Sequence, residues 1–333
     1  MRGHAIEARL YAEDPANDFL PSTGTLAAWQ PSTSVDARFD SAIETGSEVG
    51  IEFDPMLAKV ITHAPTRQEA AGRLARALET TRVQGLVTNR DFLVAVLRSP
   101  EFLAGDTTTD FIERVTLSPR RTPARAELEE ACILAAMAAQ VDRRRVAKVL
   151  GTIPTGWRNT VMPREEVSFQ SLSDGAAEEI LVEYRRRRDG SFGVRIGEDE
   201  RTVSVLSCQG GEIALVIDGR RVSATVTAER ARRFVHGPAG DVELLELPRF
   251  PAKEVEAVSG GLVAPMPGKV IAVHVGTGEV VEAGQLLLVL EAMKMEHRII
   301  APMAGTISEL RVAEGDQVDN GELVVVLDEE EAS

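Results

Sequence analysis

Lys294 lies between Met293 and Met295 in the segment EAMKMEH, residues 291–297. A lysine amine is a site of covalent modification wherever a modifying enzyme can reach it. Methionine side chains are flexible and polarizable, so this pair suits contacts with an apolar cofactor ring or with a modifying enzyme. Taken alone, the lysine would be a solvated surface charge and the methionines ordinary core residues. What indicates a cofactor-bearing lysine is the place of this segment in the chain.

The segment joins two half-copies of one pattern, residues 264–291 and 301–328, in register at a constant offset of 37 residues. The matching positions are Ala264, Pro265, Met266, Gly268, Gly278, Gly284 and Leu290 in the first copy and Ala301, Pro302, Met303, Gly305, Gly315, Gly321 and Leu327 in the second. Short strands separated by glycines are typical of small antiparallel units. We therefore predict two units packed about a pseudo-twofold axis, joined by a hairpin over residues 291–300 with Lys294 at its tip. An exposed turn on a rigid scaffold is where such a lysine can be both modified and used.

The stretches VAPMPGKV, EAMKMEH and IAPMAGTI resemble the biotin carboxyl carrier domain of biotin-dependent carboxylases, over about residues 259–328. The resemblance implies a flattened β-barrel of the biotinyl/lipoyl type. It also implies biotin attached covalently to Lys294 by a biotin protein ligase, with Met293 and Met295 beside the cofactor. The lipoyl domain is similar in fold but usually places its lysine in a D-K-A sequence. A lipoylated carrier of a dehydrogenase complex is therefore the alternative.

The composition limits what else the chain can be. Its 333 residues predict two or three domains, and 52 Asp and Glu against 37 Lys and Arg, a formal net charge of −15, argue against nucleic-acid binding. The arginine run at residues 185–188 precedes the hairpin signal Asp189-Gly190 and is interpreted as a solvated strand end. Two cysteines and five scattered histidines indicate neither a disulfide framework nor a metal site. Without a signal peptide or a long apolar run, we expect a cytoplasmic protein with no membrane segment.

Residues 3–115 hold a second set of patterned segments. Residues 5–11 and 56–63 are predicted strands, and residues 66–80 an amphipathic helix with Thr66 and Glu69 in a capping box. Residues 88–97 repeat the capped-helix pattern. The stretches GHAIEARLYAEDP, FLPSTG, FDPMLAKVI and VQGLVTNRDFL resemble, in that order, the α/β carboxyl-terminal subdomain of biotin carboxylase. This resemblance implies that Arg9 contacts biotin and stabilises its enolate oxygen; the alternative is a strand arginine paired with a surface carboxylate.

A strand that begins almost at residue 1 suggests a chain that starts inside a domain. In the resembled family the glycine-rich nucleotide loop, the magnesium-binding glutamates and the bicarbonate-handling residues precede this subdomain, and the sequence shows no equivalent. Phosphoryl transfer from ATP needs a metal and phosphate clamps. We therefore expect the chain by itself to be inactive in biotin carboxylation, although the complete family enzyme uses ATP and Mg²⁺. The missing ATP-grasp part would belong to a longer gene product or to a separate polypeptide.

The middle region follows a Pro- and Arg-rich linker at residues 119–123. A helix is predicted over about residues 124–150, and because its stretch 131–139 is apolar on every face, it must be surrounded. Strands are predicted at residues 179–187, 192–196, 201–206, 212–217 and 221–227, with Asp189-Gly190 and Asp218-Gly219 as hairpin turns. The pattern indicates a β-barrel or strongly curved sheet around a central helix.

This organisation, with IPTGWRN at residues 153–159, is similar to the domain that joins biotin carboxylase to the carrier in acetyl-, propionyl- and methylcrotonyl-CoA carboxylases. In that family the domain docks the carboxyltransferase (beta) subunit. Trp157 is either part of such a docking surface or a core anchor. The expected fold class is multidomain α+β. The expected domains are an incomplete biotin carboxylase subdomain at residues 1–117, a docking domain at 118–247, a linker at 248–260 and a carrier at 261–329.

The resemblances together imply the biotin carrier and partial biotin carboxylase portion of an acyl-CoA carboxylase alpha subunit, a ligase. Biotin on Lys294 would be carboxylated with ATP and bicarbonate and would deliver the carboxyl group to an acyl-CoA on the partner carboxyltransferase subunit. The sequence does not specify the acyl-CoA. A stand-alone, non-catalytic biotinyl carrier or scaffold protein is the other alternative.

Overall fold

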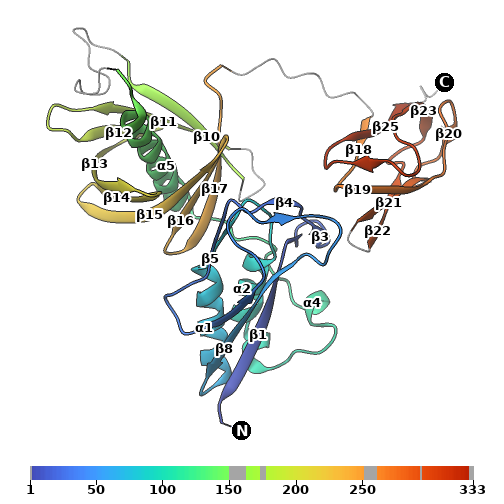
Figure 1. Cartoon of the computed structure of the whole chain (residues 1–333), viewed down its shortest axis with the longest axis horizontal. Helices are drawn as coiled ribbons and strands as arrows, with labels where there is room; N and C mark the ends of the chain where they lie inside the picture. Colours follow the sequence, from blue (N-terminus) through green and yellow to red (C-terminus); the bar gives the residue numbers. More distant parts are fainter. Residues whose placement is uncertain (1, 150–162, 173–177, 251–260, 293–294, 330–333) are drawn as a thin grey trace.

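The computed structural model of the protein describes residues 2–149, 163–172, 178–250, 261–292 and 295–329, which form three units along the chain (Figure 1). An amino-terminal α/β unit is followed by a β-barrel around a helix and by a sandwich of two small sheets. The predicted multidomain α+β architecture is confirmed. Among the described residues, no helix is long and apolar enough to cross a bilayer.

The amino-terminal unit is built on a three-stranded antiparallel sheet in the order β1-β8-β6. Its strands are β1 (His4–Tyr11), β6 (Arg38–Ser41) and β8 (Met56–Ala64). Two-stranded ribbons are formed by β2 (Glu13–Asp14) with β3 (Leu20–Pro21), β4 (Gly24–Thr25) with β7 (Glu48–Val49), and β5 (Ala28–Gln30) with β9 (Arg82–Gln84). The helices of this unit are α1 (Arg67–Glu79), α2 (Arg90–Arg98), α3 (Pro100–Ala104) and α4 (Phe111–Arg114).

Helix α1 follows the sequence prediction. Thr66 is its N-cap, and the Thr66 side chain accepts a hydrogen bond from the Glu69 backbone N–H at 3.2 Å, which satisfies one of the free donors of the first turn. Leu74 and Leu78 are fully buried on the face that packs against β1 and β8. This face anchors the helix to the sheet.

Residues 88–97 were predicted to form a second helix with a side-chain cap; the helix is present, but the predicted cap is wrong. Helix α2 has Asn89 at its N-cap, but the Asn89 side chain makes no capping hydrogen bond. Its amide oxygen instead accepts from the Tyr11 backbone N–H at 2.9 Å, and its amide nitrogen donates to the Arg9 carbonyl at 3.3 Å. Asn89 is buried, so its polar atoms need partners. The end of β1 provides them, and Asn89 becomes a clamp between strand and helix.

The middle unit is a closed antiparallel barrel, because its first strand, β10, pairs with its last, β17. Its strands are β10 (Glu165–Ser171), β11 (Glu179–Arg186), β12 (Phe192–Ile196), β13 (Asp199–Gln209), β14 (Glu212–Ile217), β15 (Arg220–Glu229), β16 (Arg232–Gly237) and β17 (Gly240–Glu246). All five predicted strands are present. The predicted turn at Asp218-Gly219 has φ of 49° and 82° at its two residues, as a two-residue hairpin turn of type I′ requires.

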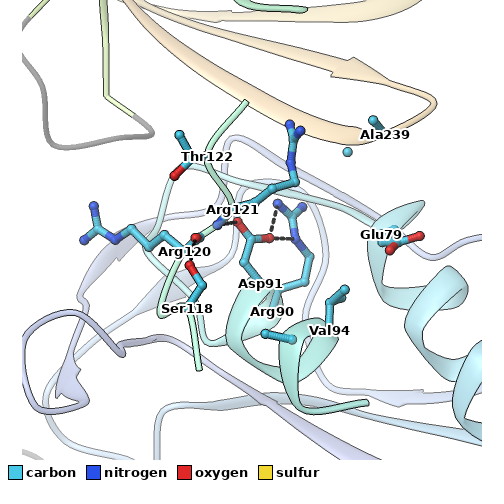
Figure 2. Close-up of a pocket in the computed structure, with 11 residues that line it drawn as sticks. Glu79, Arg90, Asp91, Val94, Ser118, Arg120, Arg121, Thr122 and Ala239 are labelled. Carbon is cyan, nitrogen blue, oxygen red and sulfur yellow. Dashed lines mark hydrogen bonds and ion pairs between the residues drawn. The ribbon is translucent and has the colours of Figure 1, made fainter. Parts of the chain in front are cut away.

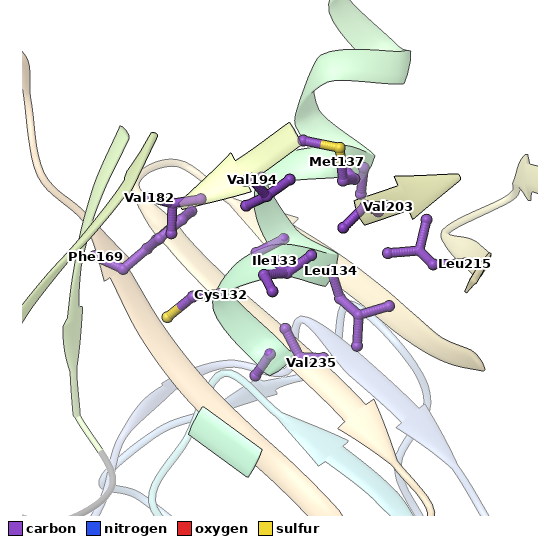
Figure 3. Packing of buried hydrophobic residues seen from close by; sticks show 14 of the residues in the cluster. Cys132, Ile133, Leu134, Met137, Phe169, Val182, Val194, Val203, Leu215 and Val235 are labelled. Atoms are coloured by element: carbon purple, nitrogen blue, oxygen red, sulfur yellow. The ribbon is translucent and has the colours of Figure 1, made fainter. Parts of the chain in front are cut away.

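Helix α5 (Arg125–Val146) lies inside this barrel (Figure 3). Its residues 131–138 are all buried, and Ile133, Leu134 and Met137 pack against barrel side chains such as Phe169 and Leu215. A helix that is apolar all round is stable only when it is covered on every side. The barrel provides that cover, as the sequence predicted.

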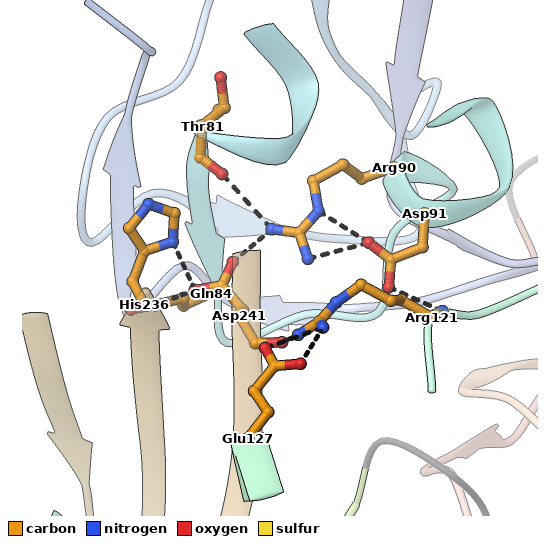
Figure 4. A network of polar contacts seen from close by, with 8 residues as sticks. All are labelled: Thr81, Gln84, Arg90, Asp91, Arg121, Glu127, His236 and Asp241. Atoms are coloured by element: carbon orange, nitrogen blue, oxygen red, sulfur yellow. Dashed lines mark hydrogen bonds and ion pairs between the residues drawn. The ribbon is translucent and has the colours of Figure 1, made fainter. Parts of the chain in front are cut away.

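The barrel meets the amino-terminal unit through a buried polar network (Figure 4). Asp241 of β17 pairs with Arg90 of α2, and each side chain is only 9% exposed. The Asp241 carboxylate also accepts hydrogen bonds from Gln84 Nε2 at 2.6 Å and His236 Nδ1 at 2.9 Å. Arg121, in the segment between the units, donates to the Asp241 carbonyl at 2.8 Å. These contacts join the two units by charge and hydrogen bonding.

The carboxyl-terminal unit consists of two four-stranded sheets in the orders β18-β25-β23-β20 and β22-β21-β19-β24. The strands are β18 (Gly261–Val263), β19 (Gly268–Val273), β20 (Val280–Val281), β21 (Leu286–Ala292), β22 (Met295–Ile300), β23 (Gly305–Leu310), β24 (Gln317–Val318) and β25 (Leu323–Glu329). The offset of 37 residues maps β19, β20 and β21 onto β23, β24 and β25. Since it also exchanges the two sheets, the predicted pseudo-twofold symmetry is confirmed.

Candidate cofactor-attachment site

The predicted lysine hairpin is formed by β21 and β22, which pair antiparallel. The last pair in their register joins Ala292 to Met295, so Met293 and Lys294 connect the two strands. Both of these residues lie outside the described part of the chain, and of Met295 only the strand position is described. The hairpin is confirmed, whereas the attachment of a cofactor to Lys294 stays a prediction.

Hydrogen bonds that start in one half-copy and end in the other hold the sandwich together. They come in pairs related by the 37-residue offset: Gly278 N to Ile307 O (2.7 Å) with Gly315 N to Val270 O (2.8 Å), and Gly284 N to Ala301 O with Gly321 N to Ala264 O (both 2.8 Å). Each half therefore satisfies backbone groups of the other. Neither half is complete alone, so the hairpin sits on one jointly formed scaffold.

Glycines are required at the turns that make these bonds. Gly278, Gly284, Gly315 and Gly321 all have positive φ, between 80° and 100°, where other residues are strained. Gly305 is required for a different reason, because a Cβ there would lie 2.5 Å from the Asp328 carbonyl oxygen. The glycines noted in the sequence thus set the geometry of the scaffold.

The base of the hairpin is buried and its charged residues are exposed. Leu290 and Ile299 belong to the sandwich core, while Glu291 and Glu296 face solvent. Glu291 is paired in register with Glu296 on one side and with Lys269 of β19 on the other. A covalently tethered group fits a connection between two such strands, because they are part of a rigid sheet and the described charged residues next to the connection are exposed.

Arg9 lies on β1 with 60% of its side chain exposed. Hydrogen bonding to Tyr11, and then to Glu7, raises its pKa, so the guanidinium is always charged. Glu7 is its ion-pair partner at 3.5 Å, which is the surface-carboxylate pairing that the sequence left open as the alternative to biotin contact. Asn89 holds the Arg9 carbonyl and the Tyr11 N–H, on either side of Leu10, and this clamp was missed because a residue before a helix is usually read as a cap.

A cavity of about 320 Å³ lies where the amino-terminal unit, the segment at residues 118–122 and the barrel meet (Figure 2). Arg90, Asp91 and Arg121 line it, and they bond to one another or to neighbouring carboxylates. The charges that face this cavity are therefore balanced within the chain.

The described residues offer little competing chemistry. No group of three or more His, Cys, Asp or Glu residues among them is placed to hold a metal ion. Burial raises the pKa of the Cys132 thiol to about 12, and burial also raises the pKa of Cys208. A thiol that stays protonated is a poor nucleophile. Trp157 lies outside the described residues, as does most of the predicted linker, residues 251–260.

Three protein-family models match the chain in succession. Residues 7–114 match the biotin carboxylase C-terminal domain, residues 128–249 match the BT domain of the methylcrotonyl-CoA carboxylase alpha-subunit, and residues 261–327 match the family described as biotin-requiring enzyme. Each match coincides with one of the three folded units. The order of the families is the order that the sequence resemblances implied.

The two curated relatives that follow agree with these family matches. Over 315 residues the chain is 30% identical to the mitochondrial methylcrotonoyl-CoA carboxylase subunit alpha of Mus musculus, covering 90% of this chain and 43% of that protein. It is 32% identical over 327 residues to the propionyl-CoA carboxylase alpha chain of Ruegeria pomeroyi, covering 89% of this chain and 47% of that protein. Among solved structures, the biotin carboxylase subunit of a pyruvate carboxylase is 38% identical over 34% of this chain and 25% of that chain, with a TM-score of 0.33. The chain thus spans less than half the length of these curated relatives.

Proposed function

Because the chain belongs to the acyl-CoA carboxylase alpha-subunit family, whose biotin carboxylase carboxyl-terminal, BT and biotinyl carrier domains it carries in that order, we propose that it carries biotin on Lys294. In this role it presents the cofactor to a biotin carboxylase site and to a carboxyltransferase. The observation that supports the proposal is the position of Lys294 in the two-residue connection between β21 and β22, on the symmetric scaffold. Biotin, when bound, supplies a ureido nitrogen that can accept and release a carboxyl group.

The residues of this chain contribute position and reach to that reaction. Cross-half hydrogen bonds hold together the sandwich from which β21 and β22 extend, so a ligase meets the lysine segment on a defined scaffold. Tethering through residues 248–260 keeps the lysine at an effective concentration of about millimolar near sites within reach. Glu291 and Glu296, which lie on either side of the lysine segment, are exposed carboxylates.

Arg9 is proposed to act at the biotin carboxylase site. Its charge is permanent, its side chain is largely exposed, and its position on β1 is fixed by Asn89. A fixed guanidinium can stabilise negative charge that develops on a ligand oxygen. The Mg²⁺ of the complete family enzyme would be held by residues other than Arg9, since a guanidinium has no acceptor atom to offer a metal ion.

The barrel is proposed to dock a carboxyltransferase subunit. The support is that residues 128–249 match the BT domain of the methylcrotonyl-CoA carboxylase alpha-subunit. Deleting residues 120–250 should abolish binding to the carboxyltransferase in a pull-down assay while leaving biotinylation of Lys294 intact. Biotinylation serves as the folding control for the carrier. Retained binding by the shortened chain would contradict a docking role for the barrel.

Intact-protein mass spectrometry tests the attachment. The chain is produced in a host with active biotin and lipoate ligases, beside the variants Lys294→Arg and Lys269→Arg. Lys269 is the matched control, because it lies on the neighbouring strand and pairs with Glu291. We expect a biotinyl increment on the unsubstituted chain and on Lys269→Arg, and none on Lys294→Arg. A lipoyl increment, or an unmodified Lys294, would refute the proposal.

A further inference from the structure

One end of the barrel carries an excess of exposed arginine. We call it the arginine end and define it by Arg185, Arg186 and Arg188, where β11 turns into β12. All three side chains are exposed. Within the described part of the chain, none of the three takes part in an ion pair, whereas the neighbouring Arg187 pairs with Glu200 at 3.0 Å. Three positive charges without an ion-pair partner, at the end of β11 and in the turn that follows it, form a local positive field in a chain whose net charge is −15.

The strand register places the arginine end two strands away from the point where the chain leaves the barrel. Glu165 of β10 pairs with Tyr184 of β11, and the Leu247 N–H after β17 donates to the Ser168 carbonyl of β10. Ser168 in turn pairs with Leu181, four residues before Arg185. Two strand spacings of about 5 Å each and a rise of about 13 Å along β11 therefore put roughly 17 Å between Leu247 and Arg185. A groove of about 560 Å³ lies beside Leu247, and Tyr184 and Glu165 also line it.

The sandwich at the other end of the connection is strongly acidic. Residues 261–329 contain eleven Asp and Glu against four Lys and Arg. Five of the carboxylates are exposed in or next to the turns that the 37-residue offset relates. They are Glu279, Glu282, Glu314, Asp316 and Asp319. Joining any acyl group to the Lys294 amine would remove a further positive charge. The carrier and the arginine end are thus complementary in sign.

Covalent geometry allows the two to meet. The connection at residues 248–260 has 13 residues, which span at most about 45 Å whatever their conformation. A sandwich held within that radius is present at an effective concentration of about millimolar. A contact with a dissociation constant of about 1 mM, too weak to matter between separate molecules, would then be about half occupied.

We propose that the arginine end is a resting dock for the acidic carrier of the same chain. The contact is electrostatic and solvent-exposed, so it is weak, reversible and sensitive to salt. Docking there returns the carrier to the barrel between its visits to the biotin carboxylase and carboxyltransferase sites. It does not depend on which group Lys294 carries. The acidic residues are spread over several turns of the carrier. The arginine end can therefore hold the carrier near the barrel without fixing the orientation of the carrier.

Small-angle X-ray scattering of the full chain tests the dock. At about 25 mM salt, where the Debye length is roughly 20 Å, we expect a smaller radius of gyration than at about 500 mM salt. The variant Arg185→Glu/Arg186→Glu/Arg188→Glu should show the larger radius at both salt concentrations. The control Arg2→Glu/Arg73→Glu/Arg221→Glu changes the net charge equally at exposed positions away from the turn and should behave like the unsubstituted chain.

Each other outcome has a defined meaning. A radius that is independent of salt, or that the arginine-end variant leaves unchanged, overturns the proposal, and so does a control that expands equally. Growth of the scattering mass with protein concentration would show contact between molecules and would also overturn it. If the reversed variant loses its circular dichroism spectrum, Arg185→Ala/Arg186→Ala/Arg188→Ala replaces it, and an intermediate radius is expected.

Discussion

The junction between the amino-terminal unit and the barrel should fail when Asp241 is replaced by alanine. The Arg90–Asp241 pair is buried on both sides (Figure 4), and removing one partner of a buried pair typically costs about 3–5 kcal/mol, because an uncompensated charge remains. Arg90 keeps Asp91 at 3.0 Å, so we expect the lower end, about 3 kcal/mol. The exposed pair of Arg38 and Asp40 provides the control, and Asp40→Ala should cost less than about 1 kcal/mol.

Urea denaturation followed by circular dichroism measures this difference. Because the two units need not unfold together once the junction is broken, hydrogen exchange at β17 and α2 should accompany it. We expect Asp241→Ala to lose protection on both elements. A cost for Asp241→Ala no larger than that for Asp40→Ala, with unchanged exchange at β17, would refute the view that this pair holds the units together.

The same pair sets the acid response of the junction. Burial by itself would raise the pKa of Asp241, but the Arg90 charge and the His236 hydrogen bond oppose it, and the pKa lies below its usual value. A carboxyl group with a lowered folded-state pKa contributes stability that is fully present above its unfolded pKa, about 3.9, and is lost as the pH falls through the folded value. Below about pH 4, the stability of the unsubstituted chain should therefore approach that of Asp241→Ala. If the difference between the two persists at still lower pH, the pair is not its source.

Three further predictions concern single side chains. Asn89→Ala removes a buried amide that clamps β1 and should lower the free energy of unfolding by about 1–3 kcal/mol, whereas exposed Asn17→Ala should change it by less than about 0.5 kcal/mol; equal effects in urea would argue against the clamp. Met137→Ala empties the centre of the barrel and should cost about 2–5 kcal/mol by the same measurement, and a cost under about 1 kcal/mol would mean that α5 is not packed as described. Gly305→Ala forces a Cβ against the Asp328 carbonyl and should destabilise the sandwich by about 1–3 kcal/mol, with slower biotinylation on an avidin blot; an unchanged melting temperature would contradict that close approach.

Much of the candidate site could be read from the sequence because its information is local. The half-copies, their glycines and the hairpin between them depend on spacing along the chain, and the structure places them as expected. The start of α1 at Thr66 and the all-apolar stretch of α5 were readable for the same reason. The attachment of biotin to Lys294 and the role of Arg9 stay predictions, because they concern molecules other than this chain.

What the sequence did not reveal depends on residues far apart in the chain. Strands β10, β16 and β17 were not predicted, and the pairing of β10 with β17 closes the barrel. Arg90 and Asp241 are 151 positions apart, and no periodicity connects them. Asn89 has the residue type and position of a helix cap, yet it clamps a strand, because the fold brings the end of β1 within reach of its amide. Local spacing therefore determined the carrier and the covered helix, whereas only tertiary packing decided which distant polar groups would be buried together.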